Sequence, residues 1–239
     1  MKFLQEDTNF LRHSAIIAGV SLLIMTLAAF FSYGYVHSSL INPDNPLATL
    51  NNIEASAHLF KAGIFGWFVI LITDILVSWA FYLFLKPLHK GFAVLAAWLR
   101  LMYTAILAIA LSNLLQVVEL VSYRGELFNE SQITLASQVF MSIRTFESTW
   151  AFGLIVFGMH LLIVGIVVIN TKTVPKVISI LLIAGGVSYI LIQLLIVFFP
   201  TFDNVITILE IILSIPMTIG ELGFGVWLLI KGGKTPFRH

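Results

Sequence analysis

The chain has 239 residues, of which 59% are hydrophobic and only 10% are charged, and its formal net charge is +1. A soluble domain carries about a quarter charged residues, so this chain has too few to cover a surface in water. We therefore expect an integral membrane protein whose partner is the lipid bilayer, with one membrane domain over residues 1–239. The near-zero net charge gives no support for a nucleic-acid partner. Cysteine is absent, which excludes disulfides, thiolate catalysis and Cys-ligated metals.

Six apolar runs each reach the roughly 20 residues needed to cross the hydrocarbon core as an α-helix. Backbone groups in lipid must be satisfied within their own segment, which favours helices. The first run is too long for a signal-peptide core, and no small-residue cleavage site follows it. The predicted fold is therefore all-α, a polytopic bundle of six transmembrane helices. The runs cover residues 14–36, 62–85, 91–118, 150–170, 177–199 and 205–230.

The distribution of basic residues predicts the orientation of the chain. Of the 13 Lys and Arg residues, Arg100 lies inside a span, and Lys61, Arg124 and Arg144 lie on one side of the membrane. The remaining nine lie on the side that carries both ends of the chain. Because basic residues accumulate in cytoplasmic loops, both termini are predicted to be cytoplasmic.

Two longer connections on the predicted outer side show amphipathic patterns. The first follows Pro46, which suits the first position of a helix, and the second follows Ser131, a candidate N-cap. We expect two short amphipathic helices lying on the outer membrane surface or capping the bundle. The pattern is equally consistent with outward extensions of the adjoining spans.

Four spans each carry an ionisable residue at the same depth. Counted from the nearest basic residue on the cytoplasmic side, Asp74, Arg100, His160 and Glu221 lie ten to twelve residues into their spans. At 1.5 Å per residue this is roughly 15–18 Å, near the bilayer midplane. Tyr189 lies at a similar depth in the fifth span. An ionisable side chain in mid-bilayer costs on the order of 3 kcal/mol, so these residues are expected to face one another in a shared polar layer.

The last span also carries a polar stripe. Glu210, Ser214 and Thr218 share one face with Glu221, which lies about 20° around the helix from Glu210. Pro216 removes one backbone hydrogen bond within this span. A broken helix with an acid beside the break is typical of transporter substrate sites, although a simple kink explains the proline as well. If the stripe lines a path, that path runs from the outer surface to the polar layer.

Three functions are consistent with this pattern. The first hypothesis is a pocket that binds or passes a small or amphiphilic ligand. The second is a membrane enzyme acting on a lipid-phase substrate, with Glu221 or His160 as acid or base. The third is a structural or regulatory protein whose layer is only a buried ion-pair network. The candidate ligand-binding residues are Asp74, Arg100, Tyr103, His160, Tyr189, Glu210, Thr218 and Glu221.

We expect no metal and no cofactor. Asp74, His160 and Glu221 are residue types that bind zinc, manganese or iron, but Arg100 in the same layer would repel a cation. His160 is the sole histidine predicted at membrane depth, which excludes bis-histidine haem ligation within one chain. No predicted span contains the lysine that a retinal Schiff base requires.

Short motifs along most of the chain are shared with a known family. They lie at residues 18–19, 52–64, 74–75, 85–87, 99–101, 153–162 and 184–189. These motifs resemble the bacterial membrane family called domain of unknown function 4386. The resemblance implies a small protein of the cytoplasmic (inner) membrane of a prokaryote, and it implies no particular reaction. Asp74, Arg100 and His160 fall inside the resembling stretches, whereas Glu210 and Glu221 fall outside them.

Overall fold

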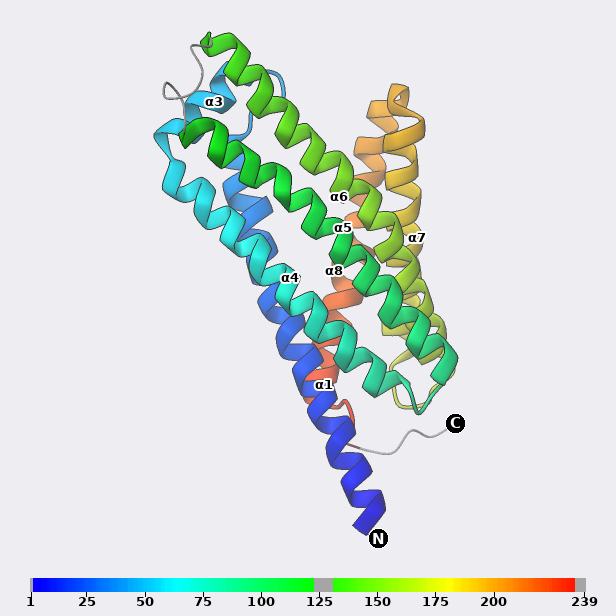
Figure 1. Ribbon diagram of the computed structural model, residues 1–239. Helices are drawn as coiled ribbons and strands as arrows, with labels where there is room; N and C mark the ends of the chain where they lie inside the picture. Colours follow the sequence, from blue (N-terminus) through cyan, green and yellow to red (C-terminus); the bar gives the residue numbers. More distant parts are fainter. Residues whose placement is uncertain (1, 123–130, 235–239) are drawn as a thin grey trace. The chain divides into compact units, whose positions relative to one another are not determined.

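The computed structural model describes residues 2–122 and 131–234 (Figure 1). Within these two stretches all regular secondary structure is helical, as the sequence predicts. In chain order the elements are α1 (Lys2–Ala29), η1 (Phe30–His37), α2 (Ser38–Leu40), α3 (Pro46–Ala55), α4 (Ala57–Leu85), α5 (Lys90–Ser122), α6 (Gln132–Ile169), α7 (Lys176–Phe198), η2 (Pro200–Phe202) and α8 (Asp203–Ile230).

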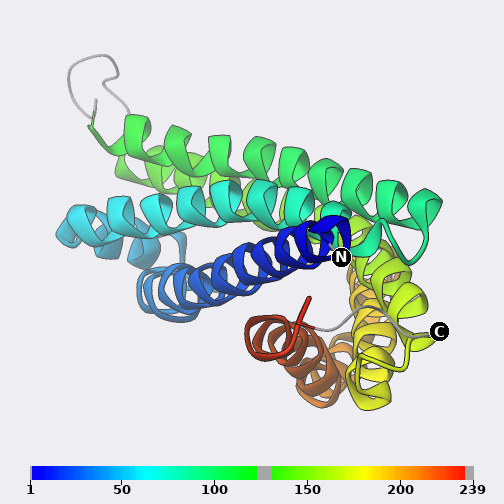
Figure 2. The same ribbon diagram turned by 90° about the horizontal axis from the view of Figure 1, so that it is seen from below.

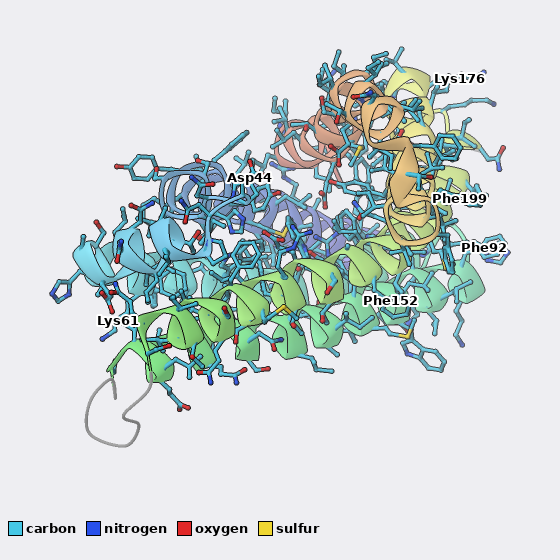
Figure 3. All side chains as sticks on the ribbon, turned by 90° about the horizontal axis from the view of Figure 1, so that it is seen from above. Asp44, Lys61, Phe92, Phe152, Lys176 and Phe199 are labelled. Carbon is cyan, nitrogen blue, oxygen red and sulfur yellow. The ribbon has the colours of Figure 1, made fainter. Side chains whose placement is uncertain are left out.

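Six helical stretches in the described residues are long and apolar enough to cross a membrane, which confirms the predicted number. They are Asn9–Leu40, Ala57–Leu85, Lys90–Ser122, Gln132–Ile169, Lys176–Phe198 and Asn204–Ile230. Large apolar side chains on these helices are exposed, among them Phe152 at 57% and Phe92 at 38%, and Figure 3 shows Phe92 pointing away from its helix. Such exposure is expected of helices that face lipid.

Only one of the two predicted outer helices exists as a separate element. Helix α3 begins at Pro46, and the side chain of Asn45 caps it by accepting a hydrogen bond of 3.0 Å from the Ala48 N–H. The second region instead runs without interruption from Gln132 into α6, which agrees with the alternative interpretation, an extension of the adjoining span, and not with a second separate helix. No proline or glycine lies between Gln132 and Gly153 to interrupt the backbone hydrogen bonds.

The first span changes its backbone pattern near its predicted outer end. Residues Phe30–His37 form a π-helix, in which each N–H bonds the carbonyl five residues earlier. Periodicity arguments assume 100° per residue and therefore did not predict this change.

Contacts divide the chain into two compact units. The first unit contains Met1–Ile24, Ile72–Thr104 and Ala151–His239, and the second contains Met25–Leu71 and Ala105–Trp150. Helices α1, α4, α5 and α6 contribute residues to both units. Helices α7 and α8 belong wholly to the first unit and pack side by side (Figure 2). That residues 1–239 form a single membrane domain stays a prediction.

Glycines let helices of the first unit approach closely. A Cβ atom on Gly186 of α7 would lie 2.7 Å from the carbonyl oxygen of Gly158 of α6. A Cβ on Gly220 of α8 would lie 2.8 Å from the carbonyl oxygen of Leu181 of α7. Small residues at helix crossings are usual in membranes, where van der Waals contact drives helix association.

The C-terminal end of α8 is held by Arg12 of α1. Arg12 Nη1 donates hydrogen bonds of 2.9 Å to the carbonyls of Leu228 and Gly232, and Nη2 donates to the carbonyl of Leu229. Carbonyls at a helix end lack intrahelical partners, and a cation there also complements the helix dipole. Gly233 follows with a φ of +69°, in the left-handed region that glycine tolerates. The beginning of α1 and the end of α8 therefore lie together in the first unit.

Candidate functional site

The guanidinium of Arg100 lies at the centre of a buried polar cluster in the first unit. Its Nε donates a hydrogen bond of 2.9 Å to Asp74 Oδ1 on α4, and its Nη2 lies 2.7 Å from the same oxygen. Its Nη1 donates to Glu221 Oε1 on α8 at 3.1 Å and lies 3.2 Å from His160 Nε2 on α6. Of the four ionisable residues that depth counting placed in one layer, Asp74, His160 and Glu221 thus each contact Arg100. We call Asp74, Arg100, His160 and Glu221 the polar cluster.

The hydrogen bonds of His160 determine its protonation state. Its Nδ1 lies 2.8 Å from the carbonyl oxygen of Ala96, which can only accept a hydrogen bond. Its Nε2 faces Arg100, which can only donate. The proton must therefore be on Nδ1 and the lone pair on Nε2, so the ring is neutral.

Burial differs among the members of the polar cluster. Asp74, Arg100 and His160 are 0% exposed, whereas the side chain of Glu221 is 16% exposed. With His160 neutral, two carboxylates face one guanidinium. The guanidinium fills the position between the carboxylates that a metal ion would have to occupy, so the arrangement argues against a metal bound by Asp74, His160 and Glu221.

Two oxygens of the polar cluster accept no hydrogen bond from the described residues. Asp74 Oδ2 is buried without a partner. Glu221 accepts its hydrogen bond at Oε1, which leaves Oε2 without one. Buried polar groups are usually satisfied, so Asp74 Oδ2 requires an explanation.

Aromatic rings surround the polar cluster. The Arg100 guanidinium carbon lies 5.8 Å from the ring centroid of Phe81 and 5.3 Å from that of Phe157. Phe157 also contacts Tyr103 and Tyr189, with ring centroids 4.9 Å and 5.2 Å apart. The candidates Tyr103 and Tyr189 therefore reach the polar cluster through Phe157.

Sequence reasoning missed Phe81 and Phe157, although a signal was present. Phe81 follows Asp74 by seven residues and Phe157 precedes His160 by three, so each shares a helix face with a member of the polar cluster. Ser78 lies between Asp74 and Phe81 on α4, and its hydroxyl donates a buried hydrogen bond of 2.9 Å to the carbonyl of Ala97 on α5. This bond fixes the two helices that carry Asp74 and Arg100.

The structure leaves the candidates Glu210 and Thr218 apart from the polar cluster. Both are exposed on α8, and among the described residues neither makes a hydrogen bond to the polar cluster. Glu210 lies eleven residues before Glu221, about 16 Å along the helix. Helix α8 continues through Pro216, so the proline does not break it.

A second group of polar and aromatic side chains lies in the second unit. His37 Nε2 is 3.1 Å from Glu147 Oε1, and Arg144 donates to Glu147 Oε2 at 3.0 Å. Tyr33 stacks on His37 and meets Trp150 edge-on, with ring centroids 5.0 Å and 4.9 Å apart. Sequence reasoning did not find this group, because its members come from distant segments and one of them ends a π-helix.

Comparison with known proteins identifies the family to which this chain belongs. The family model "Domain of unknown function (DUF4386)" matches residues 17–232, and the chain belongs to this family, as the motifs predict. The matched range includes Glu210 and Glu221 as well as the other members of the polar cluster. The chain is also similar to an "Uncharacterized protein" of Archaeoglobus fulgidus, with 27% identity over 171 residues, which are 72% of this chain and 84% of the relative. No solved structure matches the chain.

Proposed function

We propose that this member of the DUF4386 family binds, or passes across the membrane, a small or amphiphilic ligand at the polar cluster. The observation that carries the proposal is the unused acceptor capacity of two carboxylates. Asp74 Oδ2 is buried without a partner, and Glu221 is partly exposed with Oε2 unbonded in the described structure. An unsatisfied buried polar group costs about 1–3 kcal/mol, which a layer with a purely structural role has no reason to retain.

The polar stripe of α8 supports a route to this site. Glu210, Ser214 and Thr218 are exposed on the face that leads along the helix to Glu221. Carboxylates and hydroxyls are poor neighbours for acyl chains, so this face is expected to meet water, a ligand or other helices. A route along α8 would deliver a ligand to Glu221 first.

In the proposed topology both termini are in the cytoplasm. The proposed location is the inner membrane of a prokaryote. The nine-to-three distribution of basic residues outside the spans supports this orientation. The contact of Arg12 with the last turn of α8 supports placing both ends of the chain on the same side. In this topology α3 lies at the outer surface.

A second candidate is an enzyme that acts on a lipid-phase substrate. The geometry favours Glu221 over His160 as its acid or base, because both ring nitrogens of His160 are already engaged. Within the polar cluster, Glu221 alone combines an unbonded oxygen with partial exposure. The third candidate, a layer with only a structural role, predicts no ligand.

Binding of matched amphiphiles tests the proposal. The full chain in dodecyl maltoside would be incubated with dodecylammonium, dodecanoate or dodecanol, and thermal unfolding would be followed for the wild type and for Glu221→Gln. We expect at least one probe to raise the Tm of the wild type in a saturable manner and to have a much weaker effect on the variant. If none of the probes produces a shift that depends on Glu221, the binding proposal is wrong and the structural candidate gains.

A further inference from the structure

The formal charge of the polar cluster is not balanced. Asp74 and Glu221 each contribute one negative charge when ionised, and Arg100 contributes one positive charge. His160 contributes none, because Ala96 and Arg100 fix its neutral form. The sum is −1 at a site where three of the four side chains are 0% exposed. An uncompensated buried charge is strongly unfavourable, so the site is complementary to one additional positive charge, which either a proton on a carboxylate or a cationic ligand supplies.

The hydrogen-bonding capacity that remains points the same way. Arg100 has five N–H donors, and contacts to Asp74, Glu221 and His160 engage four of them. Little of the guanidinium is left to bind an anion. The groups of the polar cluster that stay unbonded within the described structure, Asp74 Oδ2 and Glu221 Oε2, are acceptors. A ligand that satisfies them must donate hydrogen bonds.

The surroundings favour an organic cation over a metal ion. No group of three or more His, Cys, Asp and Glu side chains that could hold a metal occurs in the described part of the chain. Hard cations take about six or more oxygen ligands, whereas the polar cluster has two free carboxylate oxygens. The rings of Phe81, Phe157 and Tyr189 add apolar surface beside the polar cluster, which suits an organic group better than a hydrated metal ion.

Access to the site suits an amphiphile. Glu221 is the one partly exposed member of the polar cluster, and Ile211 and Ile215 beside the polar stripe are exposed on the same helix. An alkyl tail can therefore stay among apolar side chains and lipid while its polar end reaches Glu221.

From the charge and the hydrogen-bonding capacity together, we infer that the ligand of the polar cluster is an amphiphilic amine, whose protonated ammonium group donates hydrogen bonds to Glu221. This inference rests on the proposed function and specifies its ligand class. It assigns Glu221 the role of the contacting carboxylate and Asp74 that of a second negative charge behind it.

The three dodecyl probes separate the ligand classes in wild-type protein, without the need for any variant. We expect dodecylammonium to stabilise the protein with at least tenfold higher apparent affinity than dodecanoate or dodecanol. Dodecyltrimethylammonium has the charge but no N–H donor, and we expect it to bind at least tenfold more weakly than dodecylammonium. If the anionic or neutral probe binds best, and does so through Glu221, the proposed function survives and the inference is overturned.

Two variants locate the effect at the polar cluster. Glu221→Gln should lose the preference for dodecylammonium, whereas Glu119→Gln, which removes an exposed carboxylate of α5 in the second unit, should keep it within twofold. Glu221→Asp retains the charge and should preserve the preference for the cation if Glu221→Gln does not fold. An equal response of Glu221→Gln and the wild type would mean that the amine acts on the micelle, and would overturn the inference. A saturable, Glu221-dependent shift with sodium or potassium chloride alone would overturn it in favour of an inorganic cation.

Discussion

Replacing Arg100 with methionine is expected to destabilise the first unit more than any neutralisation of a carboxylate in the polar cluster. Arg100 lies 2.7 Å from Asp74 Oδ1 and 3.1 Å from Glu221 Oε1, and Arg100 and Asp74 are 0% exposed. Without the guanidinium, the formal charge of the site falls from −1 to −2, with the negative charges facing each other. Removing one partner of a buried ion pair costs about 3–5 kcal/mol.

Asp74→Asn provides the contrast that makes this expectation specific. It removes a hydrogen-bonded carboxylate, at about 1.5–3 kcal/mol for a bond to a charged group, but it brings the formal charge of the site to zero. The double variant Asp74→Asn, Arg100→Met should be more stable than Arg100→Met alone, with a coupling energy of about 1–3 kcal/mol. The order of stability is therefore wild type, Asp74→Asn, the double variant and then Arg100→Met.

Thermal unfolding in dodecyl maltoside measures this order. For a chain of this size, about 1 kcal/mol corresponds to 2–4 °C in Tm, so Arg100→Met should unfold roughly 6–20 °C below the wild type. Arg144→Met is a matched control, because Arg144 also pairs with a glutamate but is 58% exposed. Exposed pairs contribute less than about 1 kcal/mol. The charge argument is refuted if Asp74→Asn is the less stable of the two single variants, or if Arg100→Met and Arg144→Met have equal Tm values.

Three further substitutions test the packing of the helices. Arg12→Gln should lower the Tm by a few degrees and speed hydrogen exchange in the last turn of α8, because that turn loses charged donors to its carbonyls. Gly186→Leu should lower the free energy of unfolding by about 1–3 kcal/mol or more, since its Cβ would lie 2.7 Å from the carbonyl oxygen of Gly158. Gly223→Ala should be neutral in the same unfolding assay, because no atom lies within 4 Å of the added Cβ. Asn45→Ala removes the N-cap of α3 and should cost about 1 kcal/mol, seen as a loss of helical circular dichroism on mild heating.

Depth counting placed the members of the polar cluster together because two constraints, on direction and on depth, apply to each of them. The cost of an ionisable group in lipid requires Asp74, Arg100, His160 and Glu221 to face inward, and the rise per residue fixes their level. Equal depth and inward direction leave few arrangements in which these side chains do not meet. The same reasoning could not predict which atoms of the polar cluster form hydrogen bonds, because that depends on the rotation of each helix about its axis.

The prediction for Glu210 and Thr218 shows where the reasoning ends. Around α8, Glu210 and Thr218 lie about 20° and 60° from Glu221, yet the structure leaves both exposed. A shared stripe fixes the direction of a side chain but does not determine whether another helix is present at that level.

The pair of His37 and Glu147 could not be predicted from the sequence for a related reason. Its members are 110 positions apart, and a π-helix changes the angles between residues that a regular helix would predict.

The two carboxylates of the polar cluster differ in a way that their sequence positions do not reveal. Asp74 meets the guanidinium at two nitrogens, is fully buried and lies on a helix tied to α5 by the bond from Ser78. Glu221 meets it at one nitrogen, at the longer distance of 3.1 Å, and keeps an exposed edge. Neutralising Asp74 therefore acts on the fold first, whereas neutralising Glu221 acts on what the polar cluster can bind. The structural and ligand-binding candidates are thus separable within one cluster, because each depends on a different carboxylate.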